Sequence, residues 1–331
     1  MQRSSITEAT HRAQALAQRG AVAEAYGQLQ QAIAAGDGLA AATLADWRMA
    51  GQIVRRDIGA AQALYGRAFE LGVDAAAGPF TALLASGAGG SARDWPAALA
   101  LLSRREADPV ARLQARLIAA MDLDEAGDPR RVPPAGPIRS SPRIVGIREF
   151  LTADECRYLI AVAAPRLQPS EVVDPRSGRL IRDPVRTARA AAFPLVLEDP
   201  VLHAINRRIA AATGTAWAQG EPAQVLCYRP GEEYRLHSDA LPPGPNQRVI
   251  TVLVALNDDY GGGETRFPAV GLAWRGRTGE ALVFGNVDRA GAADPAARHA
   301  GTPVARGTKL LLSRWIREHP LDLSGPPGKP F

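Results

Sequence analysis

The sequence predicts two domains, an α-solenoid of helix hairpins followed by a β domain of the sandwich or jelly-roll type with flanking helices. Residues 8–126 are rich in alanine and leucine at helical spacing and show no strand-like alternation. Beyond residue 220, short runs of β-forming residues are separated by glycine-rich and aspartate-rich turns. A length of 331 residues also favours two domains over one.

Composition narrows the class of protein. The chain is 46% hydrophobic and 22% charged, and no run of about 18 apolar residues is present, which excludes a membrane-spanning helix. Its polar N-terminus lacks the apolar core of a secretory signal, so we expect a cytoplasmic protein without a membrane partner. Two distant cysteines, Cys156 and Cys227, exclude a disulfide framework and a thiolate metal site.

The formal net charge of +5 comes from arginine, because the chain has 37 arginines and two lysines. We interpret this preference for arginine as a codon-composition bias and not as a sign of a phosphate-binding surface. Nucleic acid is therefore not an expected partner.

The helical part contains a period of about 36 residues. Gly51 recurs as Gly87, and the segment 56–61 recurs as 93–98. Such a period indicates helix hairpins, in which glycine ends a helix at a left-handed position. Residues 1–126 resemble Sel1-like or tetratricopeptide repeats. Two roles are open for them, an interaction module that recruits a protein and a helical cap that shields the next domain.

Residues 127–143 contain five prolines and two glycines and are predicted to be a linker, because proline cannot complete the hydrogen bonding of a helix or central strand. The second domain is expected over residues 144–319, with a tail at 320–331. Its first helix is predicted within 148–167, where Thr152 and Glu155 form a capping-box pattern. The predicted strands are 224–230, 248–257, 264–268, 280–285 and 308–316.

A candidate metal site begins with His237 and Asp239, whose side chains share one side of an extended segment. With five histidines and 34 acidic residues, such a pair arises by chance about as often as not. His299, at the start of a late strand, supplies a third ligand. Two histidines and one carboxylate are the donor set that leaves open positions on Fe(II).

The other three histidines are predicted to be structural. His203 lies in a helical stretch, His319 precedes a proline in the tail, and His11 belongs to the first helical segment.

Lys309 is the only lysine in the predicted folded part of a chain that otherwise uses arginine. An ammonium group can meet a small carboxylate in a narrow barrel where the wider guanidinium would not fit. A surface lysine at a strand edge is the alternative. If Lys309 does not bind this carboxylate, three arginines are the alternative cations: Arg298, Arg306 and Arg314.

Several motifs together suggest a family. They are Tyr228–Tyr234 leading into His237–Asp239, Arg248–Leu253, Gly262–Pro268, His299–Val304, Gly307–Lys309 and Trp315–Glu318. With these motifs, residues 144–319 resemble the prolyl 4-hydroxylase-like 2-oxoglutarate and Fe(II)-dependent dioxygenases.

The resemblance implies a double-stranded β-helix in which His237, Asp239 and His299 form the catalytic iron centre. It also implies that Lys309 pairs with the distal carboxylate of 2-oxoglutarate, beside a hydrogen bond from Tyr228. Thr251 and Trp315 complete the implied cofactor-binding set, O2 is the second co-substrate, and ascorbate is a candidate cofactor. An aspartate at position 239 favours hydroxylation over the related halogenation.

Residues 171–187 look like the mobile loop that covers the substrate in this family, which implies a substrate lid formed by Arg176, Arg186 and Tyr234. After Thr187 the chain departs from the serine-containing and glycine-containing family pattern and has Ala188 and Arg189. The alternative is an arginine-rich surface loop without a role in specificity.

Three functions remain open. The leading one is a hydroxylase of a protein or peptide, acting on proline, with release of succinate and CO2. The second is the same chemistry on a free amino acid or small metabolite, and the third is a non-catalytic repeat scaffold with a relic oxygenase fold. The intact ligand set and Lys309 argue against the third.

Overall fold

The structure is a computed structural model, and it describes residues 2–90, 92–173, 180–182 and 185–331, with side chains outside 2–7, 171–173 and 180–182. The chain forms two compact units. The helical unit comprises residues 1–128, 195–204 and 322–331, and the β unit comprises residues 129–194 and 205–321.

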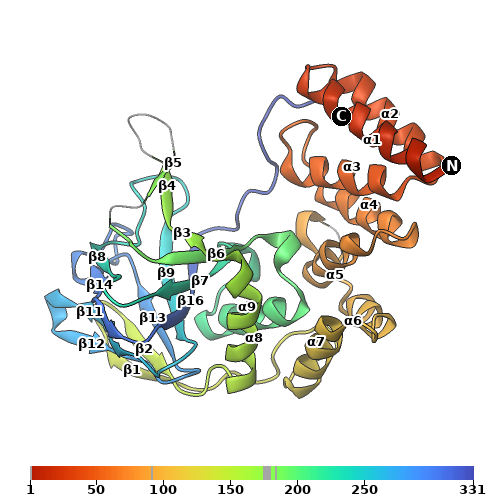
Figure 1. Ribbon diagram of the computed structural model, residues 1–331. Coiled ribbons are helices and arrows are strands. Elements are labelled where there is room, and N and C mark those ends of the chain that lie inside the picture. The colour runs from red at the N-terminus through yellow and green to blue at the C-terminus, as the bar shows by residue number, and fades with distance from the viewer. Residues whose placement is uncertain (1, 91, 174–179, 183–184) are drawn as a thin grey trace. The chain divides into compact units, whose positions relative to one another are not determined.

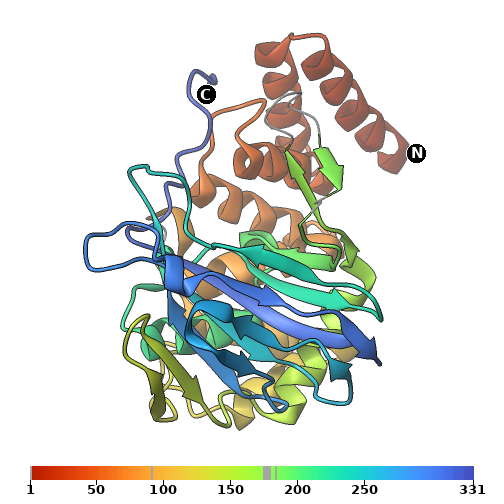
Figure 2. The same cartoon turned by 90° about the vertical axis from the view of Figure 1, so that its left-hand side faces the viewer.

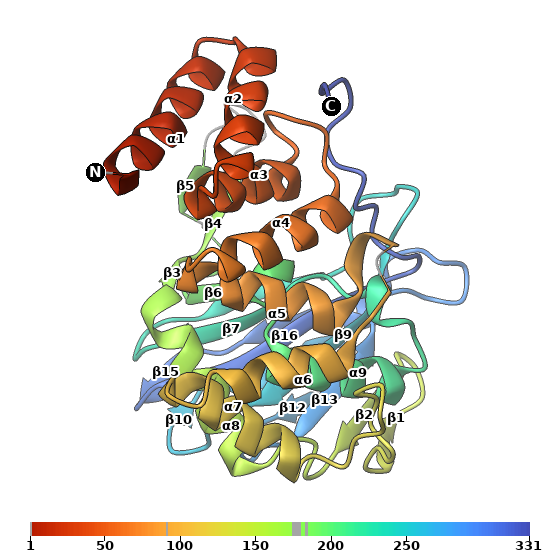
Figure 3. The same ribbon diagram turned by 90° about the vertical axis from the view of Figure 1, so that its right-hand side faces the viewer.

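Seven α-helices follow one another through the first 120 residues of the part that the structure describes (Figures 1 and 3). They are α1 (Gln2–Gln18), α2 (Val22–Ala34), α3 (Gly38–Ala50), α4 (Ile58–Glu70), α5 (Ala77–Ser86), α6 (Trp95–Arg104) and α7 (Pro109–Ala120). None of the helices in the described residues is long and apolar enough to cross a membrane.

Residues that recur in the sequence occupy equivalent helix ends. Gly51 and Gly87 follow α3 and α5 with φ of 67° and 62°, a left-handed conformation that glycine adopts without steric cost. Asp57 and Asp94 accept hydrogen bonds from the first turns of α4 and α6. The sequence period therefore corresponds to a repeated pattern of helix ends.

Two segments distant in sequence complete the helical unit. Residues 195–204 contribute two pieces to this unit. The first is a short 3₁₀ turn that packs on α5, and the second is the start of α9 (Pro200–Thr213). From the C-terminal segment, Phe331 stacks on Tyr26 with ring centroids 4.3 Å apart. The sequence predicted one domain boundary near residue 126. It did not predict that residues 195–204 and 322–331 belong to the helical unit, because packing between distant segments leaves no local sequence signal.

The β unit contains an eight-stranded sheet in which every pairing is antiparallel (Figure 2, with β16 in blue). Its order is β1 (Ala135–Arg139), β2 (Ile144–Ile147), β13 (Ala281–Gly285), β9 (Arg248–Ala255), β16 (Lys309–Arg317), β7 (Ala223–Tyr228), β6 (Arg189–Phe193) and β3 (Gln168–Pro169).

A four-stranded antiparallel sheet has the order β12 (Leu272–Trp274), β11 (Thr265–Phe267), β14 (His299–Gly301) and β8 (Tyr234–His237). Two short ladders pair β10 (Gly261–Gly262) with β15 (Val304–Arg306) and β4 (Glu171–Val173) with β5 (Leu180–Arg182).

The five predicted strands are confirmed as β7, β9, β11, β13 and β16, and the predicted helix is α8 (Ala153–Ala163) with the full capping box of Thr152 and Glu155. Strand β1 corrects the interpretation of residues 127–143 as linker throughout. It tolerates Pro137 because it is the edge strand, where a missing N–H breaks no central ladder.

A core cluster joins the two sheets beside the metal-site candidate. It contains Ile144, Leu253, Phe267, Leu282 and Phe284, all buried. The His299 ring lies 4.7 Å from the Phe284 ring and 5.3 Å from the Phe267 ring, centroid to centroid. This packing fixes one histidine of the site on a rigid apolar wall.

Candidate active site

Two neighbouring strands bring the predicted metal ligands together. His237 ends β8 and is paired in register with His299, which begins β14, and Asp239 follows two residues after His237. Each histidine Nε2 faces Asp239, at 3.5 Å from Oδ1 for His237 and 3.6 Å from Oδ2 for His299. One donor atom from each residue lies within 4.8 Å of the others.

The hydrogen bonds of both histidines set the tautomer that a metal needs. Nδ1 of His237 donates to the carbonyl of Arg235 at 2.7 Å, and Nδ1 of His299 donates to the carbonyl of Ala297 at 3.1 Å. With the proton on Nδ1, the lone pair of Nε2 is directed at the shared site. Burial lowers the pKa of His299 to about 4 despite the opposing charge of Asp239, so this imidazole is neutral at pH 7.

A chain of buried side chains supports Asp239. Burial alone would raise its pKa, but His237, His299 and Thr251 together hold the pKa of Asp239 well below its usual range. The Thr251 hydroxyl donates to Asp239 Oδ2 at 2.7 Å, and Asn286 Nδ2 donates to Thr251 Oγ1 at 2.9 Å. Asn286 is not among the residues predicted from the sequence, and its only sequence signal is its place directly after a predicted strand.

The donor set fits a divalent transition metal. His237 Nε2 is buried and makes no hydrogen bond within the described residues, which leaves its lone pair without a partner in the protein. This orphaned nitrogen, the neutral imidazole of His299 and the ionised carboxylate of Asp239 form the two-histidine, one-carboxylate arrangement typical of non-haem Fe(II).

Lys309 lies in the same cavity and is 3% exposed. Its ammonium donates to the carbonyl of Gly263 at 2.6 Å and lies 5.3 Å from the centre of the Tyr228 ring, its partner across β16 and β7. Burial lowers the pKa of Lys309 to about 8, and nearby Glu264 opposes this shift. Gly263 has φ of 69°, and a Cβ there would lie 3.2 Å from the lysine stem.

Alternation along β16 places four side chains on the cavity wall: Lys309, Leu311, Ser313 and Trp315. Lys309 and Trp315 were predicted from the sequence, and the period of two along a strand is the signal that adds Leu311 and Ser313. Trp315 is paired in register with Thr251, and its Nε1 is buried without a hydrogen-bond partner in the described residues.

Of the predicted lid residues, Arg186 and Tyr234 line the cavity, whereas Arg176 lies outside the described residues. The Tyr234 ring stacks on His237 with centroids 3.4 Å apart, and the Arg186 guanidinium carbon lies 5.4 Å from the centre of the Tyr234 ring. These two side chains therefore form a layer directly above one of the metal-ligand candidates.

The alternative residues lie elsewhere. The Arg314 guanidinium is buried and donates to the backbone carbonyls of Asn206, Trp217 and Glu221, so it is a structural cation. Arg298 and Arg306 are exposed. His203 is buried in α9 with Nδ1 2.8 Å from Glu198, while His11 and His319 are exposed; all three are outside the candidate site.

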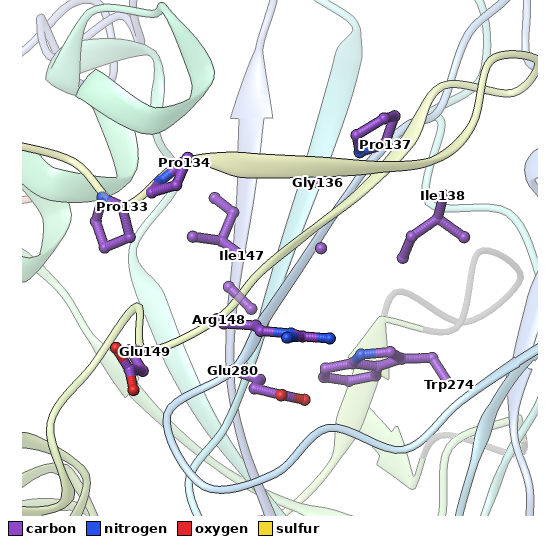
Figure 4. Close-up of a pocket in the computed structure, with 12 residues that line it drawn as sticks. Pro133, Pro134, Gly136, Pro137, Ile138, Ile147, Arg148, Glu149, Trp274 and Glu280 are labelled. Atoms are coloured by element: carbon purple, nitrogen blue, oxygen red, sulfur yellow. The ribbon is translucent and has the colours of Figure 1, made fainter.

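A larger cavity of about 600 Å³ lies at β1 and β2 and holds none of the candidate ligands (Figure 4). Apolar side chains of Ile138, Ile147 and Trp274 surround it, and Arg148 and Glu149 beside them are exposed. The chemistry-bearing cluster is therefore in the smaller cavity between β8, β14, β9 and β16.

Comparison with known proteins places this cluster in context. The model of the 2OG-Fe(II) oxygenase superfamily matches residues 223–317, which include His237, Asp239 and His299. "Prolyl 4-hydroxylase 1" of Arabidopsis thaliana is 36% identical over 197 residues, covering 54% of this chain and 70% of that protein. "Prolyl 4-hydroxylase subunit alpha-1" of Rattus norvegicus is 31% identical over 194 residues, covering 56% of this chain and 36% of that one.

Among solved structures, a collagen prolyl hydroxylase of Paramecium bursaria Chlorella virus-1 in complex with 2OG is similar, with 27% identity and a TM-score of 0.43. The match covers 53% of this chain and 95% of that one.

Proposed function

The chain belongs to the prolyl 4-hydroxylase family of the 2OG-Fe(II) oxygenase superfamily, and from this premise we propose that it hydroxylates prolyl residues in a protein or peptide. It is a 2-oxoglutarate-dependent dioxygenase that uses Fe(II). The observation that carries the substrate proposal is the convergence of His237, Asp239 and His299 beside buried Lys309, in a chain whose relatives are named prolyl 4-hydroxylases.

His237, Asp239 and His299 would hold Fe(II). The bound metal supplies the oxidising chemistry with 2-oxoglutarate and O2: one oxygen atom enters a substrate C–H bond as hydroxyl, the other enters succinate, and CO2 leaves. The protein's own contribution is to fix the ligands, orient the co-substrate and exclude water from the buried cavity.

Lys309 would bind the distal carboxylate of 2-oxoglutarate, with Tyr228 beside it. The support is a buried ammonium that donates to the carbonyl of Gly263 and carries two further N–H donors. Thr251 has a different role from the cofactor contact implied by resemblance, because its hydroxyl is committed to Asp239. Trp315 lies on the cavity wall, and its indole N–H has no hydrogen-bond partner among the described residues, so it remains a cofactor-contact candidate.

The two antiparallel sheets with the candidate ligands between them support a double-stranded β-helix, that is, a jelly roll. The equivalent helix ends in the helical unit support a repeat array of the Sel1 or tetratricopeptide type. We propose that this array recruits a protein substrate. Leu39 and Val110 of the helical unit, 45% and 53% exposed, offer apolar contacts to such a partner.

Anaerobic loading with Fe(II), followed by 2-oxoglutarate, O2 and a panel of proline-containing peptides, tests the function. We expect succinate and a peptide mass gain of one oxygen atom, both lost in His237→Ala. Turnover with free proline but with no peptide would favour the small-molecule alternative. No succinate under any condition, with or without ascorbate, would contradict the enzymatic function.

Recruitment is tested separately. Once a protein substrate is in hand, Leu39→Asp combined with Val110→Asp should weaken its hydroxylation while leaving hydroxylation of a short peptide unchanged, because only the larger substrate reaches the helical unit. Equal rates on the protein for both forms would leave the helices a structural role.

A further inference from the structure

A second pocket adjoins the active-site cavity and shares Arg186 with it. The volume is about 170 Å³, several times the roughly 30 Å³ that a water molecule occupies in the liquid. Its other lining residues are Pro169, Ser170, Thr187, Ala188, Arg189 and Glu232.

Ser170 presents an unsatisfied donor in this pocket. It is 4% exposed, and its hydroxyl has no hydrogen-bond partner in the part of the chain that the structure describes. Its backbone N–H is already used, because it donates to the carbonyl of Ala188 at 2.9 Å. A buried hydroxyl without a partner is energetically costly, so this group indicates a missing polar ligand.

The charge of the pocket favours an anion. Arg186, 9% exposed, and Arg189, at the start of β6, contribute two guanidinium groups, whereas Glu232 contributes one carboxylate. Glu232 is already engaged, since its Oε2 accepts from the backbone N–H of Arg229 at 2.8 Å. Arg189 lies in the stretch after Thr187 where this chain departs from the family pattern.

Building on the proposed function, we infer that this pocket, the acidic subsite, binds a carboxylate of the substrate close in sequence to the target proline. An unmodified peptide carries no other anion. A planar guanidinium recognises a carboxylate through two parallel hydrogen bonds, and the Ser170 hydroxyl can donate a third. An aspartate or glutamate side chain and a free C-terminus present the same chemistry.

The test uses the full-length protein and fluorescent peptides with one proline, blocked at both ends, with glutamate at each position from three before to three after that proline. Each has a glutamine twin, and a third set ends in a free carboxylate. Binding is measured by fluorescence anisotropy and hydroxylation by mass. We expect at least one carboxylate-bearing peptide to bind fivefold or more tightly than its neutral twin. Tighter binding of a glutamate peptide identifies the recognised carboxylate as a side chain. Tighter binding of a peptide with a free C-terminus identifies it as the chain end.

Three variants should change the preference, not all in the same direction, and a fourth is a control. Arg189→Gln and Ser170→Ala should each reduce the preference for glutamate, whereas Glu232→Gln should increase it by removing the like charge. Arg157→Gln, on the exposed face of α8, makes the same change in net charge as Arg189→Gln and should leave the preference unaltered.

Equal binding of every carboxylate peptide and its twin would overturn the acidic subsite, and so would a preference that persists in Arg189→Gln. Binding that depends on Arg189 but leads to no hydroxylation would instead contradict the proposed function and leave the subsite intact. The two failures are therefore distinguishable.

Discussion

The hydroxyl of Thr251 donates a 2.7 Å hydrogen bond to Oδ2 of Asp239, and both residues are buried. Because Asn286 in turn donates to Thr251, the hydroxyl hydrogen is directed at the carboxylate. This relay restricts rotation of the carboxylate while leaving Oδ1 towards His237, 3.5 Å from its Nε2. An outer hydrogen bond of this kind positions a metal ligand without touching the metal.

Thr251→Val, which keeps the side-chain shape and removes the hydroxyl, should weaken Fe(II) binding by about 10-fold to 100-fold. Thr251→Ser should restore most of the affinity because it restores the donor. Anaerobic Fe(II) titration measures the effect, with thermal unfolding to check that the fold is retained. Wild-type affinity in Thr251→Val would show that the relay does not position Asp239.

His237→Ala and His299→Ala should abolish both Fe(II) binding and 2-oxoglutarate turnover while leaving the fold largely intact, since the nitrogen atoms face a cavity. His319→Ala, a change to an exposed histidine, is the matched control and should behave like the wild type. Metal titration and succinate release measure the two losses. Turnover at the wild-type rate in either variant would contradict the assignment of that histidine as a metal ligand.

Lys309→Ala should raise the 2-oxoglutarate concentration for half-maximal turnover by well over tenfold with little change in Fe(II) affinity. Removing the buried partner of a carboxylate costs on the order of 2–5 kcal/mol of binding. Lys309→Arg should also be impaired, because the guanidinium is wider than the ammonium. An unaltered requirement for 2-oxoglutarate in Lys309→Ala would refute this role.

The 2-oxoglutarate requirement should also rise with pH. The pKa of Lys309 is lowered to about 8 by burial, so the ammonium predominates at pH 7 and is lost as the pH passes 8. Binding of the dicarboxylate needs the charged form, and apparent affinity should therefore fall towards tenfold per pH unit above that pKa. Initial rates between pH 7 and 9 measure the trend, and a flat KM across this range would contradict it.

Deletion of residues 1–126 should destabilise the remaining chain. Val201, Leu202 and His203 are fully buried and belong to the helical unit, and His203 lies 6.3 Å from the Trp95 ring, centroid to centroid. Exposing such side chains costs about 1.5–3 kcal/mol each, a large share of the roughly 5–15 kcal/mol that holds a domain folded. We expect aggregation or a lowered Tm by calorimetry, and a soluble product of unchanged Tm would contradict this.

Much of the β unit was predictable from the sequence because strand signals are local. Alternating and β-branched runs located β7, β9, β11, β13 and β16, and Thr152 with Glu155 located the start of α8. The candidate ligands were also predicted, since His237 and Asp239 lie two residues apart and His299 begins a late strand. Lys309 was singled out as the only lysine in the predicted folded part. Recurring glycines likewise marked the ends of two helices, α3 and α5.

Only the tertiary structure decided which residues support the site. Ser170 carries no sequence pattern, and Asn286 has only its place after a predicted strand. Each gains its role from packing between segments that are distant in the sequence. Cross-strand register brought His299 opposite His237, and burial set the pKa of Lys309. A sequence specifies side-chain chemistry and local periodicity, whereas desolvation and hydrogen-bond partners arise only when distant segments pack. The candidate site residues could therefore be predicted from the sequence, but their pKa values and supporting hydrogen bonds could not.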